Sequence, residues 1–151
     1  MIPNNKRLVC GLHSLLSIGM WGENWAEDIR MTKKILIAED YADSRKMLKT
    51  FFESSGYDVL EASDGYEAVE KAVEERPNLI LMDVAMPALD GVQAAYVIRQ
   101  HDSLADVPIL AITAYDDFYH DSARKAGCNE VLRKPVDVSK LEPLVRHYLQ
   151  Q

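Results

Sequence analysis

The sequence is poor in cysteine, in basic residues and in long apolar runs. Of its 151 residues, only Cys10 and Cys128 are cysteines, too few and too far apart for a disulfide or zinc framework, so both thiols should be free in a reducing cytoplasm. No run of about 18 apolar residues occurs, which excludes a membrane-spanning helix. The 17 lysines and arginines are outnumbered by 24 acidic residues, and a net charge of −7 argues against direct nucleic-acid binding.

The acidic excess lies entirely after residue 30. Residues 1–30 carry three basic and three acidic side chains, so residues 31–151 carry the net charge of −7. We predict a domain at residues 31–151, preceded by an N-terminal extension at residues 1–30. Leu8, Leu12 and Leu15 have helical spacing there. The extension is therefore expected to be poorly ordered or to form a short helix, docked on the domain or on a membrane surface.

Short apolar runs alternate with helical patterns from residue 33 onward. Near-continuous apolar runs are typical of strands that helices cover on both faces, as in a parallel sheet. Five strand and helix alternations with right-handed crossovers predict an α/β fold with a doubly wound, five-stranded parallel sheet. The expected strands are Ile35–Ala38, Val59–Leu60, Leu79–Met82, Val107–Ile112 and Val131–Leu132.

Capping signals mark the starts of three expected helices. Asp64 and Glu67 have the spacing of a capping box, and a further helix is expected to begin near Asp90. Ser139-x-x-Glu142 has the same spacing and predicts the start of the last helix. Pro143 follows in or just beyond the first turn of this helix, where it should cost one main-chain hydrogen bond.

Polar residues stand at the carboxyl ends of four predicted strands. Glu39 and Asp40 follow the first strand, and the third, fourth and fifth lead to Asp83, Thr113 and Lys134. In a doubly wound sheet, side chains at these ends collect in one crevice. Crowded carboxylates resist full ionisation unless a cation joins them, and a hard divalent ion, Mg²⁺ above all, meets that need. An Asp beside such an ion can act as a nucleophile toward phosphorus, while an ammonium group and a hydroxyl stabilise the transferred phosphoryl group.

A structural explanation exists for each of these residues taken singly. An Asp after an apolar strand is commonly a loop residue or a helix cap. The joint pattern of five such residues at the strand ends of one predicted sheet favours a functional site. We therefore treat the five residues as one candidate site.

The motifs around these residues resemble the signature of the response-regulator receiver domain of two-component signalling. The resemblance extends from about Lys33 to Tyr148 and rests on Glu39-Asp40, the stretch Asp83 to Gly91, Thr113-Ala114 and Lys134-Pro135. It implies a CheY-like, flavodoxin-like (βα)5 fold with strand order 2-1-3-4-5. It also implies that a sensor histidine kinase or a histidine phosphotransfer protein donates a phosphoryl group from a phosphohistidine.

The same resemblance assigns a role to each residue of the candidate site. Asp83 would be the phosphoacceptor, which forms an aspartyl phosphate. Thr113 and Lys134 would contact the phosphoryl oxygens, and the Lys134–Pro135 bond would be cis. Mg²⁺ would be held by Asp40, by Asp83, by the main-chain carbonyl of Ala85 and, through water, by Glu39.

Three positions depart from the family pattern. Val131, three residues before Lys134, stands where the family usually has an aromatic switch residue. Tyr115 is a candidate substitute, and a solvent-facing loop aromatic is the equal alternative. Ala85 and Tyr115 also occupy the positions two after Asp83 and two after Thr113, where polar or acidic residues help to place the water that hydrolyses the acyl phosphate. We therefore predict slow autodephosphorylation.

Only Leu149 to Gln151 follow Tyr148, which leaves no room for an output domain in this sequence. We expect a stand-alone response regulator, not an enzyme, that signals by altered binding to a downstream protein partner. Both an adaptor and a relay intermediate fit this description. By the resemblance, a homodimer would form through the face of the fourth helix, fifth strand and fifth helix.

Other classes of protein share parts of this pattern. A pseudo-receiver scaffold is one alternative, but it would be expected to lack members of the acidic pocket or Lys134. A flavodoxin-like cofactor-binding protein would have a Ser-, Thr- or Gly-rich phosphate loop after the first strand, where Glu39 and Asp40 stand. A haloacid-dehalogenase-type phosphatase would have a second acid at the position of Ala85.

Overall fold

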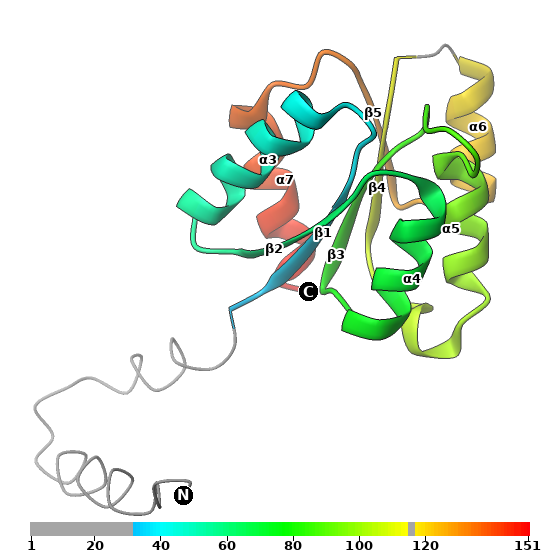
Figure 1. The fold of residues 1–151 in the computed structure, drawn as a ribbon, viewed down its shortest axis with the longest axis horizontal. Helices are drawn as coiled ribbons and strands as arrows, with labels where there is room; N and C mark the ends of the chain where they lie inside the picture. The colour runs from blue at the N-terminus through cyan, green and yellow to red at the C-terminus, as the bar shows by residue number, and fades with distance from the viewer. Residues whose placement is uncertain (1–31, 115–116) are drawn as a thin grey trace, which may run out of the picture. The chain divides into compact units, whose positions relative to one another are not determined.

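The computed structural model describes residues 32–114 and 117–151, so the prediction for residues 1–30 lies outside the described residues. Within these ranges, one parallel sheet lies between two layers of helices (Figure 1). Its five strands have the order β2-β1-β3-β4-β5, which confirms the predicted fold class and strand order. The strands are β1 (Lys34–Ala38), β2 (Asp58–Ala62), β3 (Leu79–Asp83), β4 (Ile109–Thr113) and β5 (Glu130–Arg133).

The helices of the described ranges cover both faces of the sheet. Helices α3 and α7 pack on one face, and α4, α5 and α6 pack on the other (Figure 1). No helix among them is both long and apolar enough to span a bilayer. The helices are α3 (Ala42–Ser54), α4 (Gly65–Glu75), α5 (Gly91–Arg99), α6 (Asp117–Lys125) and α7 (Val138–Leu149), with a short 3-10 helix, η1 (Asp102–Leu104), before β4.

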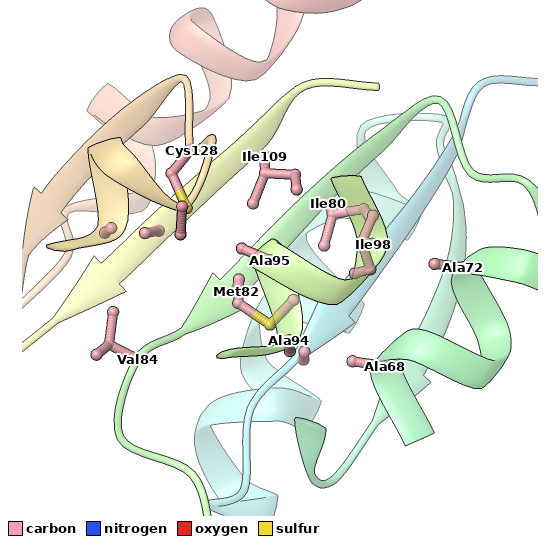
Figure 2. Close-up of a cluster of buried hydrophobic side chains, with 14 of the residues drawn as sticks. Ala68, Ala72, Ile80, Met82, Val84, Ala94, Ala95, Ile98, Ile109 and Cys128 are labelled. Carbon is pink, nitrogen blue, oxygen red and sulfur yellow. The ribbon is translucent and has the colours of Figure 1, made fainter. Parts of the chain in front are cut away.

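Successive side chains of the central strands point to opposite faces of the sheet and form two apolar clusters. Ile35 and Ile37 of β1 pack with Phe52 on the α3 and α7 side. Leu36 and Ala38 belong to the cluster beneath α4, α5 and α6, part of which Figure 2 shows. Because β3 and β4 are buried on both faces, their sequences read as near-continuous apolar runs. The helices on the second face approach the sheet through small side chains, among them Ala68, Ala72, Ala94 and Ala95.

All five strands differ from the predicted runs at one end or both, and the fourth and second strands differ most. The fourth strand begins at Ile109 rather than Val107, because Pro108 has no N–H to donate and the Val107 N–H bonds to the Leu104 carbonyl at 3.3 Å. Strand β2 is longer than predicted. It is an edge strand that pairs with β1, and its partly exposed polar residues interrupt the apolar pattern.

Two predicted capping boxes also need correction, although α4 begins directly after Asp64 as predicted. Asp64 caps α4 by accepting the Glu67 N–H at 2.8 Å, but the Glu67 carboxylate accepts from the N–H of the residue before Asp64, so the capping box is incomplete. Asp137, not Ser139, is the N-cap residue of α7, and its carboxylate accepts the Ser139 N–H at 2.9 Å. Pro143 therefore lies inside the helix, beyond its first turn.

Candidate functional site

The carboxyl ends of β1, β3 and β4 place three polar side chains in the interior. Glu39 directly follows β1, while Asp83 and Thr113 are the last residues of β3 and β4. Their exposed fractions are 4%, 3% and 0%, and they are the buried polar residues of the described chain. Burying an ionisable group costs free energy unless the group is paired. The strand ends thus hold groups whose burial calls for specific partners.

Asp40 completes a cluster of three carboxylates at this end of the sheet. One oxygen from each of Glu39, Asp40 and Asp83 lies within 4.8 Å of the others. Glu39 and Asp83 are buried, whereas Asp40 is exposed. Carboxylates this close repel one another, and oxygen donors of this kind are the ligands that hard divalent cations prefer. The cluster therefore fits a divalent cation such as Mg²⁺.

Lys134 reaches the same cluster from the residue after β5. Its Nζ donates to Glu39 Oε2 at 3.0 Å and lies 3.2 Å from Asp83 Oδ2. Its main-chain N–H donates to the Thr113 carbonyl at 2.8 Å, and the Lys134–Pro135 bond is cis. One ammonium group therefore faces two buried carboxylates, and the exposed carboxylate of Asp40 adds to the negative charge.

The ionisable groups of the site have different pKa shifts. Burial raises the pKa of Asp83 to about 7, and the charge of Glu39 adds to this rise against the opposing effect of Lys134. Burial also acts to raise the pKa of Glu39, but hydrogen bonds from the Tyr41 N–H and from Lys134 outweigh it and lower that pKa. For Lys134, burial acts to lower the pKa, and its contacts with the two carboxylates raise it overall. Glu39 and Lys134 are thus charged at neutral pH. The pKa of Asp83 lies near neutral pH, so this carboxyl group is only partly ionised there.

Two of the three residues that depart from the family pattern, Ala85 and Val131, are described by the structure. Ala85 is half-buried, and its N–H donates to Asp83 Oδ1 at 3.2 Å. Val131 is 7% exposed and belongs to the apolar cluster beneath α4, α5 and α6. His120 Nε2 on α6 lies 3.1 Å from the Val131 carbonyl oxygen and must donate, because a carbonyl oxygen can only accept. Tyr115 lies outside the described residues.

The loop between Asp83 and α5 is held by close main-chain contacts. A Cβ on Gly91 would lie 2.2 Å from the Asp83 carbonyl oxygen. A Cβ on Gly65, the first residue of α4, would lie 2.1 Å from the Leu89 carbonyl oxygen. Only glycine permits either approach. Asp90 caps α5 as expected, so the starts of two helices fix the loop that follows Asp83.

Two contacts to the site come from residues that do not stand at a strand end. Tyr41 donates its N–H to Glu39 Oε1 at 3.1 Å. Arg45, in the first turn of α3, donates from Nη1 to the Glu39 carbonyl at 2.7 Å. An argument based on strand ends misses both residues. An arginine in the first turn of the helix that follows the acidic pair is the one signal that could have indicated the second contact.

The fold and the strand-end site together define a CheY-like receiver, a class of signalling domain in two-component systems. The chain belongs to the response regulator receiver domain family, because the model of that family matches residues 35–146. The predicted family is therefore confirmed.

Relatives and solved structures agree with this assignment. The polar-differentiation response regulator DivK of Brucella anthropi is 32% identical over 123 residues, which are 79% of this chain and 98% of the relative. Chemotaxis protein CheY4 of Vibrio cholerae matches with a TM-score of 0.74 and 27% identity over 78% of this chain and 99% of its own. The receiver domain of sensor histidine kinase PA1611 from Pseudomonas aeruginosa PAO1 matches with a TM-score of 0.74 and 31% identity, over 80% of this chain and 100% of its own. That structure has a magnesium ion in its active site cleft.

Proposed function

We propose that this response regulator accepts a phosphoryl group from a phosphohistidine onto Asp83, with Mg²⁺ as cofactor, and signals by altered partner binding. The observation that carries the proposal is the pairing of a buried Asp83 with Lys134, beside two further carboxylates. The donor would be a sensor histidine kinase or a histidine phosphotransfer protein. Because such donors obtain their phosphoryl group from ATP, the cytoplasm is the expected compartment.

The site residues have distinct tasks in this reaction. A carboxylate oxygen of Asp83 forms the new bond to phosphorus, while the bond from phosphorus to the imidazole nitrogen of the donor breaks and leaves its electron pair on that nitrogen. Lys134, which already contacts Asp83 Oδ2, favours the ionised acceptor and stabilises negative charge on the phosphoryl oxygens. Thr113, buried at the end of β4, supplies a hydroxyl to the same oxygens. Mg²⁺, bound by Asp40, Asp83 and the Ala85 carbonyl, would offset the charge between carboxylates and phosphate.

Two features of the site argue against the alternative functions. A pseudo-receiver scaffold would lack part of the acidic cluster or Lys134. Here the three carboxylates lie within 4.8 Å of one another, and Lys134 contacts Glu39 and Asp83. A flavodoxin-like protein needs a phosphate cradle after β1, whereas Glu39 and Asp40 would repel a phosphate group. Phosphorylation instead adds negative charge of about −1.5 to −2 to a single crevice, which can shift the surfaces that partners contact.

Partner binding is expected on the face of α6, β5 and α7, where a homodimer would also form. Phe118 on α6 is 73% exposed. Arg133 of β5 and Asp117 of α6 form an exposed ion pair at 2.5 Å. Charged and aromatic side chains thus share a face that another protein can contact.

Phosphorylation can be tested by intact mass. We expect the protein to gain one phosphoryl group when it is incubated with MgCl₂ and acetyl phosphate, and to gain none when EDTA replaces the metal. Asp83→Asn should gain none in either condition, because no carboxylate is left at the acceptor position. A parent protein that stays unmodified in MgCl₂, or an Asp83→Asn variant that is modified equally, would reject the proposal.

The lifetime of the phosphorylated form tests the role of Ala85. The methyl group of Ala85 cannot bond to the attacking water. Ala85→Asn combined with Tyr115→Glu should therefore shorten the lifetime by about 100-fold, the lower end of the range for a positioned proton-transfer group. Loss of the adduct is followed by mass after the phosphodonor is removed. Ala105→Asn, at the exposed end of η1, is the matched control and should leave the lifetime unchanged. Equal lifetimes in the double variant and the parent would contradict the assignment.

A further inference from the structure

Arg45 links the acidic turn after β1 to strand β2. Its Nη1 donates to the Glu39 carbonyl at 2.7 Å and lies 3.5 Å from the Asp40 carbonyl. On its other side, Nε lies 3.5 Å from Glu61 Oε1 on β2. The planar guanidinium group of Arg45 therefore contacts the main-chain carbonyls of Glu39 and Asp40. On its opposite side, the ion pair with Glu61 restrains it.

The surroundings of Arg45 restrict its orientation. Its side chain is 20% exposed, so most of it is packed against the domain. Glu61 is itself held by Lys49, whose Nζ donates to Glu61 Oε2 at 2.7 Å. Arg45 and Lys49 lie one turn apart on α3 and share the same carboxylate. Only Arg45 extends from this ion-pair network to the turn that carries Glu39 and Asp40.

The turn that Arg45 contacts needs a fixed peptide plane between its two acidic residues. The Glu39 main-chain N–H is tied to the Ala62 carbonyl at 3.0 Å, and its carboxylate is tied to Tyr41 and Lys134. The carbonyl oxygen of Glu39 belongs to the peptide that leads into Asp40. Rotating this peptide would turn the exposed Asp40 carboxylate away from the other two carboxylates.

We propose that Arg45 is a positioning residue for the cation site, which holds the Glu39–Asp40 peptide so that the carboxylates converge. This inference rests on the proposed Mg²⁺ binding and assigns to Arg45 no contact with the cation itself. Loss of a group that bonds to the metal ligands, and so orients them without contacting the metal, typically weakens metal affinity by 10- to 100-fold.

Electrostatics and positioning predict opposite effects for the loss of Arg45. Removing a positive charge near a cation site should by itself strengthen Mg²⁺ binding, since like charges repel. Loss of positioning should weaken it. Methionine has a similar length and apolar stem but no donor, so Arg45→Met separates the two effects by the sign of the change.

The experiment is a titration of the full chain with MgCl₂, followed by the amide NMR signals of Asp40 and Asp83. We expect Arg45→Met to raise the dissociation constant by about tenfold. Arg45→Lys should show a smaller rise, because an ammonium group can bond to a carbonyl but cannot span Glu39 and Glu61 together. Lys49→Met, which removes a positive charge and an ion pair to the same Glu61, should bind Mg²⁺ at least as tightly as the parent.

Each outcome decides between the two explanations. A dissociation constant in Arg45→Met equal to or below that of the parent overturns the positioning role, as does an equal loss in Lys49→Met. Denaturant unfolding in EDTA shows whether the variants are folded. If Arg45→Met does not fold, Arg45→Lys is decisive: parent-like affinity overturns the proposal, and reduced affinity supports it. A parent protein that binds no Mg²⁺ refutes the proposed function instead.

Discussion

In the absence of divalent metal, Asp83→Asn is expected to raise the free energy of unfolding by up to about 4 kcal/mol at about pH 8. The carboxyl group of Asp83 is 3% exposed, and its pKa is raised to about 7, first by burial and then by the charge of Glu39. At higher pH the folded protein must carry a buried charge that the unfolded chain exposes to water. Asparagine has nearly the same shape and carries no charge, so it removes this cost.

The difference in the free energy of unfolding between Asp83→Asn and the parent should increase with pH. The pKa of Asp83 in the folded protein lies above that of an unfolded chain, about 4. Between these values the folded state binds the proton more tightly, so the stability of the parent falls as the pH rises from about 4 through about 7. The advantage of Asp83→Asn is therefore full above about pH 7, shrinks at lower pH and disappears near pH 4.

Urea denaturation in EDTA at about pH 5 and about pH 8 measures this difference. Asp43→Asn is the control, because Asp43 is an exposed acidic residue in the first turn of α3 and its removal should not stabilise the protein. If Asp83→Asn stabilised the protein equally at both pH values, better packing rather than loss of charge would be the cause.

The residues of the candidate site could be predicted because a parallel sheet makes strand ends converge. Asp83, Thr113 and Lys134 are far apart in sequence, yet each follows directly from the end of a strand that the apolar runs reveal. The sequence could not show that Glu39 is buried and Asp40 exposed. That difference depends on the path of the chain after β1, which packs one of the two side chains against other residues and leaves the other in solvent.

The contacts that escaped prediction are those between elements. The link from Arg45 through Glu61 depends on how α3 packs over β2, which no local pattern specifies. The N-cap at Asp137 was missed because Ser139 has a capping-box spacing of its own, and only the main-chain geometry decides between two candidates two residues apart. Apolar runs and capping patterns thus predict which helices and strands form. They do not specify the exact ends of these elements or the contacts between them.

Gly91→Ala is expected to destabilise the protein by about 3 kcal/mol or more and to slow phosphorylation of Asp83. Gly91 is the first residue of α5, and its N–H donates to the Val84 carbonyl at 2.9 Å. A Cβ there would meet the Asp83 carbonyl oxygen at 2.2 Å and Val84 Cα at 2.8 Å. These are main-chain atoms, so no side-chain rotation relieves the overlap. Helix α5 or the end of β3 must move, which displaces the predicted phosphoacceptor.

Gly56→Ala is the matched control for this prediction. Gly56 has φ +91°, but a Cβ there would have nothing within 4 Å, so the substitution should cost only about 1 kcal/mol of backbone strain. Helix propensity alone predicts the reverse order, since alanine is favoured over glycine in α5 by up to about 1 kcal/mol. Denaturant unfolding of both variants decides the matter. If Gly91→Ala proves as stable as the parent, the close approach of α5 to Asp83 does not limit this position, and glycine is not required to seat the phosphoacceptor loop.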